Sequence, residues 1–132
     1  MNKMFKTLGV TAVAMLIIDL IVLKILSKMW KQTIEKIQKT PFKTNPLYAG
    51  AAYVLMIFGL NYFVLGFGSK LTIPTNQLVT KAFIFGIVVY GIFDFTNLAI
   101  FTNYDLKTGL IDILWGGILM ALVTWIVKKI DF

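Results

Sequence analysis

The chain has 132 residues, of which 58% are hydrophobic and 14% charged, and this balance is too apolar for an ordinary soluble domain. It contains no cysteine and no histidine, which excludes disulfides, thiolate or imidazole metal ligands, and Ser-His or Cys-His catalysis. The net charge of +7 rests on 13 basic residues, all of them lysine. Nucleic-acid readers rely on arginine, so we predict membrane anchoring, no nucleic-acid partner and no cofactor.

Apolar runs account for most of the chain. A helix needs roughly 18 or more apolar residues to cross ~30 Å of hydrocarbon, because its backbone polar groups must pair within the segment. Four runs reach this length, at about residues 8–26, 47–67, 82–101 and 110–127. The sequence therefore predicts an all-α, polytopic membrane protein in which residues 1–132 form a single domain, a compact bundle of four transmembrane helices.

The segment after the first run carries many of the positive charges. Trp30, Ile34 and Ile37 are spaced i, i+4, i+7, which predicts an amphipathic continuation in the membrane interface, ended at Pro41. The lysines of this segment form a basic loop that we expect to face anionic lipid headgroups: Lys28, Lys31, Lys36, Lys39 and Lys43. Short loops rich in lysine usually lie on the cytoplasmic side of a membrane. The many lysines of this segment therefore favour a cytoplasmic loop with both termini outside, although the lysines of the whole chain are almost evenly divided between the two sides.

Turn residues mark the ends of the second helix. It is expected to begin after Asn45-Pro46 and to end at the sequence GFGSK. The third and fourth helices are joined by a short connection, so they are predicted to be antiparallel neighbours. Gly86, Gly116 and Gly117 are expected to let helices pack closely.

Polar residues lie inside these helices, where a charged side chain costs ~2.5 to 3.5 kcal/mol on insertion scales. Counting ~1.5 Å per residue from the helix ends puts Asp19, Asp94 and Asp112 in the same half of the bilayer. Residues three and four apart share a helix face, which aligns Asp94 with Asn97 on the third helix. The predicted intramembrane cluster consists of Asp19, Asp94, Thr96, Asn97 and Asp112, supported by Tyr53, Tyr90 and Trp115.

Such a cluster is tolerable in lipid only as a group. Its carboxyls must be protonated, hydrogen-bonded to neighbours, hydrated through a cavity, or shared with a bound cation, and the sequence leaves these alternatives and the identity of any metal open. Asp105, by contrast, is predicted to be solvated in a loop. Trp30 and Trp125 are expected to belong to aromatic belts at the membrane interfaces.

Three of these features together resemble a known family. The aspartate of the first helix, the sequence FDFTNLA at 93–99 and the sequence DILWGG at 112–117 are similar to a family of small four-helix integral membrane proteins of unknown function, found in bacteria and large DNA viruses. Its third helix usually reads Tyr-Asp-Leu-Thr-Asn-Leu-Ala, and its fourth reads Asp-x-x-Trp-Gly, which matches Asp112, Trp115 and Gly116. This chain departs from the pattern at Val22, where the family has tryptophan, and at Phe93, where it has tyrosine. The resemblance implies a four-helix membrane fold centred on the polar cluster and no particular activity.

Three functions remain open at this stage. The leading hypothesis is binding or translocation of a proton or cation by the aspartate and asparagine side chains, in a homo-oligomer if a conduction path is needed. The second is a structural membrane component of a virion or envelope assembly, with a virion or envelope protein as partner and a virion internal membrane or host membrane as location. The third is an intramembrane enzyme that uses paired carboxylates as acid and base; a non-enzymatic role is favoured over it.

Overall fold

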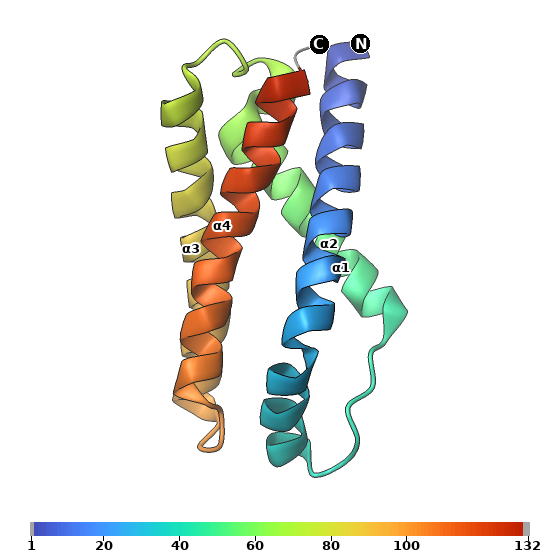
Figure 1. Cartoon of the computed structure of the whole chain (residues 1–132), viewed down its shortest axis with the longest axis vertical. Coiled ribbons are helices and arrows are strands. Elements are labelled where there is room, and N and C mark those ends of the chain that lie inside the picture. The colour runs from blue at the N-terminus through green and yellow to red at the C-terminus, as the bar shows by residue number, and fades with distance from the viewer. Residues whose placement is uncertain (1, 131–132) are drawn as a thin grey trace.

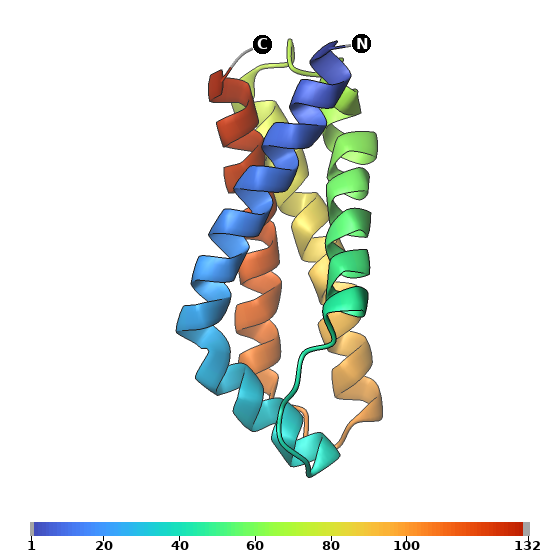
Figure 2. The same ribbon diagram turned by 90° about the vertical axis from the view of Figure 1, so that its right-hand side faces the viewer.

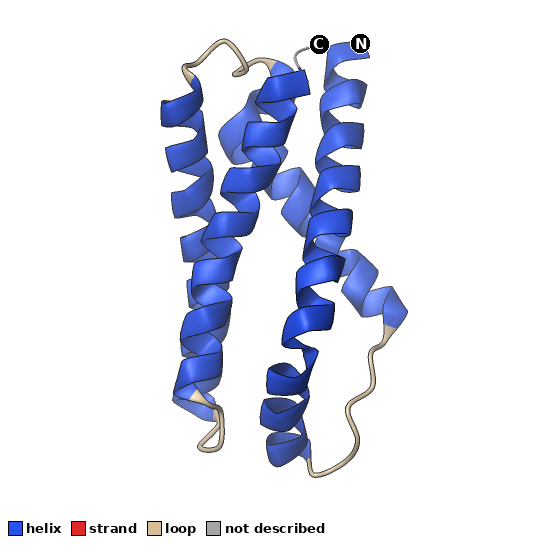
Figure 3. Cartoon of the chain, in the orientation of Figure 1, coloured by secondary structure: helices blue, strands red, loops and turns tan. Residues whose placement is uncertain are grey.

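The computed structural model describes residues 2–130, which form four helices that run alternately up and down (Figures 1 and 3). Their bounds are α1 Asn2–Gln38, α2 Pro46–Leu60, α3 Thr75–Ile100 and α4 Leu106–Ile130, and the short turns η1 Asn61–Leu65 and η2 Gly66–Gly68 extend α2. No strand occurs within residues 2–130. All four helical segments are long and apolar enough to cross a membrane, which confirms the predicted all-α polytopic class.

The longest element, α1, runs well beyond the predicted apolar run and continues to Gln38. The amphipathic segment is therefore the C-terminal part of α1 rather than a separate element. Figure 2 shows that α1 changes direction in this part, so that its last turns run towards the α3–α4 loop. The helix ends at Gln38. The next residue, Lys39, has a left-handed φ of 60°, and Pro41 follows shortly after it.

Local signals explain both ends of α2. The Asn45 side chain accepts a hydrogen bond of 3.0 Å from the Leu47 backbone N–H, and Pro46 occupies the first turn, where its missing N–H costs nothing. The helix widens into the single π turn of η1 and ends in η2, where Gly66 and Gly68 have φ angles of 58° and 101°. Glycine adopts these left-handed angles without a Cβ penalty, so GFGSK ends the helix as predicted.

The α3–α4 hairpin is the tightest part of the bundle, and glycine makes it so. A Cβ added to Gly86 would collide with the backbone of Gly116 and Gly117, and a Cβ added to Gly116 would collide with the Tyr90 ring. Close approach of the two backbones therefore requires glycine at these positions. The predicted antiparallel pairing and the close-packing role of these glycines are both confirmed.

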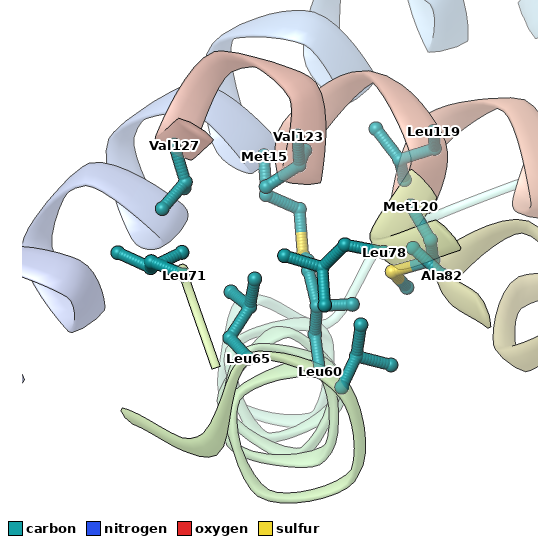
Figure 4. Close-up of a cluster of buried hydrophobic side chains, with 11 residues drawn as sticks. Met15, Leu60, Leu65, Leu71, Leu78, Ala82, Leu119, Met120, Val123 and Val127 are labelled. Carbon is teal, nitrogen blue, oxygen red and sulfur yellow. The ribbon is translucent and has the colours of Figure 1, made fainter. Parts of the chain in front are cut away.

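The apolar core fills the end of the bundle that holds both termini and the α2–α3 connection (Figures 1 and 4). Met15 contributes from α1, Leu60 and Leu65 from α2 and η1, and Leu119 and Val123 from α4. The opposite half, towards the α1–α2 and α3–α4 loops, holds the three buried aspartates. The fold thus places the apolar core in one half and the three buried carboxyls in the other. The core half also buries polar side chains, namely Thr7, Thr11, Asn61 and Thr124.

Candidate functional site

Asp19 lies at the centre of a junction between three helices. It is 4% exposed on α1, and its two carboxyl oxygens accept hydrogen bonds from different elements. The Tyr53 hydroxyl of α2 donates to Oδ2 at 2.5 Å, and the Trp115 indole N–H of α4 donates to Oδ1 at 2.8 Å. Because both oxygens have a donor, Asp19 acts as an acceptor that joins α1, α2 and α4.

Asp94 and Asp112 form a second centre, on α3 and α4. Asp94 is completely buried, and the Tyr104 hydroxyl donates to its Oδ1 at 2.6 Å. Its Oδ2 is also buried and has no hydrogen-bond partner among the described residues, and the Asp112 side chain lies within hydrogen-bonding reach of Asp94. Two carboxyls in such contact in a low-dielectric interior repel each other when both are ionised.

The other predicted site residues divide between the interior and the surface. Tyr90 lies among the three aspartates, close enough to interact with each of them, and its hydroxyl contacts the Met56 sulfur at 3.4 Å. Asn97 is half-buried beside the Tyr104 hydroxyl. Thr96 is exposed on the opposite face of α3, so the structure does not bring it to the aspartates.

Tyr104 is the residue of this site that sequence reasoning missed. It belongs to the α3–α4 loop, yet only 6% of it is exposed, because its ring packs between Trp30 and Gly109 and its hydroxyl reaches Asp94. Burial, and next the hydrogen bond to Asp94, raise the pKa of the Tyr104 phenol above its ordinary value. Tyr104 therefore keeps its proton and remains a donor to Asp94.

A cavity of about 650 Å³ opens beside the Asp94–Asp112 pair. Its walls come from the C-terminal half of α1, the α1–α2 connection, the first half of α2 and the middle of α3. The lining is mostly apolar, and Asp112 is the only charged side chain among the residues that form it. The pair is thus reached through a space lined by α1, α2 and α3, which we call the lateral cavity.

Trp30 forms part of this wall. The centroid of its ring lies 6.2 Å from that of Tyr104 and 6.4 Å from that of Phe93, so Trp30 packs against the hairpin. Its place in an aromatic belt stays a prediction. Trp125 is 46% exposed with the Lys129 ammonium 5.5 Å from its ring, an environment expected of a belt residue. The five basic-loop lysines are all exposed, and their contact with lipid or a protein partner stays a prediction.

Asp105 has a structural role that the solvated-loop prediction did not include. It precedes the first turn of α4, and its Oδ2 accepts hydrogen bonds from the Thr108 backbone N–H at 3.0 Å and the Thr108 hydroxyl at 2.7 Å. The Thr108 hydroxyl is also 3.1 Å from that of Thr33 on α1. Asp105 therefore caps α4 at the point where the end of α1 joins the hairpin.

We expect this cap to make stability depend on pH. The hydrogen bonds from Thr108 hold the pKa of the Asp105 carboxyl below its ordinary value of 3.8. A depressed folded-state pKa contributes stability that is present above the unfolded value and is lost as pH falls through the folded value. The thermal midpoint of wild type in detergent micelles should therefore drop more than that of Asp105→Asn between about pH 6 and about pH 3, because asparagine caps without a charge. Equal drops in the two proteins would contradict this role of Asp105.

The model of a family described as "Predicted membrane protein (DUF2177)" matches residues 4–128. The chain belongs to this family. DUF2177 membership and four helices capable of crossing a bilayer agree on a multi-pass membrane protein. Comparisons with curated proteins and with solved structures gave no match.

Membership in DUF2177 bears out the resemblance inferred from the sequence at the level of a membrane protein family of unknown function. The motif correspondences and the distribution in bacteria and large DNA viruses stay predictions. Because the family description names no activity, function has to be argued from the geometry of the buried carboxyls.

Proposed function

We propose that this membrane protein binds a proton at the Asp94–Asp112 pair and exchanges it between the α3–α4 loop and the lateral cavity. One observation carries the proposal. Asp94 is fully buried, one of its oxygens accepts from Tyr104, and the other has no donor among the described residues, while the Asp112 side chain lies within hydrogen-bonding reach of Asp94. A shared proton satisfies that oxygen and removes one of the two charges from the membrane interior.

The pair has a neighbour on each side that supports exchange. Tyr104, on the loop side, holds its hydroxyl against Asp94 Oδ1, and a hydroxyl both accepts and donates a proton. Asp112, on the other side, lines the cavity. A proton thus has a short route from Tyr104 to Asp94, then to Asp112 and into the cavity. Along this route no free ion enters the hydrocarbon of the membrane.

The set of side chains favours a proton over a metal cation. Calcium takes six to eight oxygen ligands and magnesium takes six. Within residues 2–130, no group of three or more acidic side chains lies close enough to hold a metal ion, and both oxygens of Asp19 already accept hydrogen bonds. Two carboxyls are sufficient for a proton.

Infrared spectroscopy of the protein in bilayers tests the proposal. We expect a protonated-carboxyl band at neutral pH that disappears in Asp94→Asn and also in Asp112→Asn, because either change removes the pair. Asp105→Asn, which alters a carboxyl outside the pair, is the matched control and should keep the band. A wild type without the band, or a band that survives in both variants of the pair, would rule out the shared proton.

Transfer is tested separately in liposomes that contain a pH-sensitive dye. Proton flux in wild type that falls in Asp94→Asn and in Tyr104→Phe would support the route through the loop side. Flux that is the same in wild type and Asp94→Asn would remove the exchange step from the proposal while leaving proton binding in place.

A further inference from the structure

The lateral cavity offers the Asp94–Asp112 pair to molecules dissolved in the membrane. Its volume of about 650 Å³ lies within the ~300 to 1,000 Å³ typical of small-molecule sites. Leu23 and Ile34 of α1, Leu55 of α2, and Phe93 of α3 present apolar surface to it, and the largely buried Asp112 reaches its wall. A chain of methylene groups fits the apolar walls, and a polar group fits beside Asp112.

The charges around the cavity restrict the chemistry of that polar group. No lysine is among the lining residues, so a phosphate or carboxylate head would meet the Asp112 carboxyl without a compensating cation. An ammonium head must move a full positive charge and three N–H donors from water to mostly apolar walls, and this desolvation cost can exceed its attraction to one carboxyl. An alcohol brings one donor and finds its acceptor in Asp112.

The hydroxyl groups on the cavity wall are weaker acceptors for an alcohol than Asp112 is. The Tyr90 hydroxyl, also on the cavity wall, contacts the Met56 sulfur and keeps its oxygen lone pairs free. The Ser27 hydroxyl on the facing side donates to the Lys24 carbonyl oxygen at 3.0 Å. These groups leave Asp112 as the strongest acceptor that the cavity offers to a single O–H.

We propose that the cavity binds a neutral long-chain alcohol, with its hydroxyl group donating to Asp112 and its chain lying between α1, α2 and α3. This inference rests on the proposed function, since it assigns the ligand class of the same carboxyl pair. The hydroxyl is thereby hydrogen-bonded to a carboxyl that exchanges a proton. The chain extends through the open side of the cavity into the bilayer.

Photocrosslinking of the whole protein in phosphatidylcholine vesicles tests the ligand class. The probes are hexadecanol, hexadecylamine and hexadecanoic acid, each with a diazirine at the same chain position, and peptide mass spectrometry locates the labels. We expect the alcohol to label residues of the cavity wall and unlabelled hexadecanol to compete. Labelling by the amine that equals or exceeds labelling by the alcohol would overturn the proposal, as would equal labelling by all three probes.

Two matched variants separate cavity filling from general damage. Ala52 lines the cavity and Ala51 is exposed beside it without lining it, so Ala52→Trp should block labelling while Ala51→Trp should not. Asp112→Asn should weaken alcohol labelling by about tenfold, because a neutral amide oxygen replaces the oxygen of a carboxyl that shares the negative charge of the pair. Wild-type labelling in both Ala52→Trp and Asp112→Asn would show that the alcohol binds elsewhere.

The infrared band keeps this inference distinct from the proposed function. A band that is present in wild type and Ala52→Trp, together with no alcohol-specific labelling, would overturn the ligand assignment alone. Alcohol-specific labelling that depends on Asp112 in a protein without the band would overturn proton sharing and support Asp112 as the acceptor for the head group.

Discussion

Replacement of Gly86 by alanine is expected to cause the largest loss of stability of any single methyl addition in the bundle. The new Cβ would collide with the carbonyl group of Gly116 and with Gly117, and backbone atoms cannot rotate away as a side chain does. The α3–α4 hairpin would have to separate, at a cost of about 3 kcal/mol or more in the free energy of unfolding. Unfolding in mixed micelles, followed by circular dichroism, measures the loss.

Gly91→Ala is the control for this experiment. Gly91 lies on the same helix, and nothing lies within 4 Å of the position its Cβ would take. Alanine should be neutral or slightly stabilising there, by up to ~1 kcal/mol from helix propensity. Equal stability of the Gly86 and Gly91 variants would mean that the hairpin is looser than the structure requires.

Replacement of Asp19 by leucine is the second change with a large expected effect. It leaves the Tyr53 hydroxyl and the Trp115 indole N–H without the acceptor that they share. Unsatisfied buried donors cost roughly 1 to 3 kcal/mol each, and some relaxation is available, so we expect a loss of about 2 to 3 kcal/mol in the same unfolding assay.

Asp19→Asn has nearly the same shape and keeps one acceptor oxygen, so its loss should be about half as large. A leucine variant as stable as wild type would show that the three-helix junction contributes nothing measurable. Because Asp19 does not belong to the Asp94–Asp112 pair, both variants should keep the protonated-carboxyl band, which separates packing from proton binding.

Hydrophobic runs and helical spacing predicted the fold well, because both signals depend only on local sequence. A run of apolar residues predicts that a helix exists, but its ends depend on caps and turns that lie outside the run. α1 therefore extends from Asn2 to Gln38 although the run covers about 8–26, and α4 begins at Leu106 rather than near 110. The cap at Asp105 had a readable signal, an aspartate directly before the helix.

The candidate site was predictable only in part. Helical spacing put Asp94 and Asp112 on facing sides of the hairpin, where the structure also has them. It gave no means to see that Asp19 has its own donors in Tyr53 and Trp115. Which donor meets which acceptor is a tertiary property. Tyr104 was missed because a loop residue has no periodicity, and only the path of the backbone returns it to Asp94.

The length of α1 makes the cavity dependent on the surrounding membrane. A helix of 37 residues spans about 55 Å, far more than the ~30 Å thickness of a hydrocarbon core. Ser27, Trp30 and Ile34 line the cavity and belong to the C-terminal half of α1. Figure 2 shows that the last turns of α1 run in a different direction from its first turns. The C-terminal half of α1 is therefore subject to hydrophobic mismatch. A thicker bilayer would draw more of this segment into lipid, and a thinner bilayer would leave more of it in the headgroup region. We therefore expect the angle of this wall, and with it access to Asp112, to change with the thickness of the bilayer.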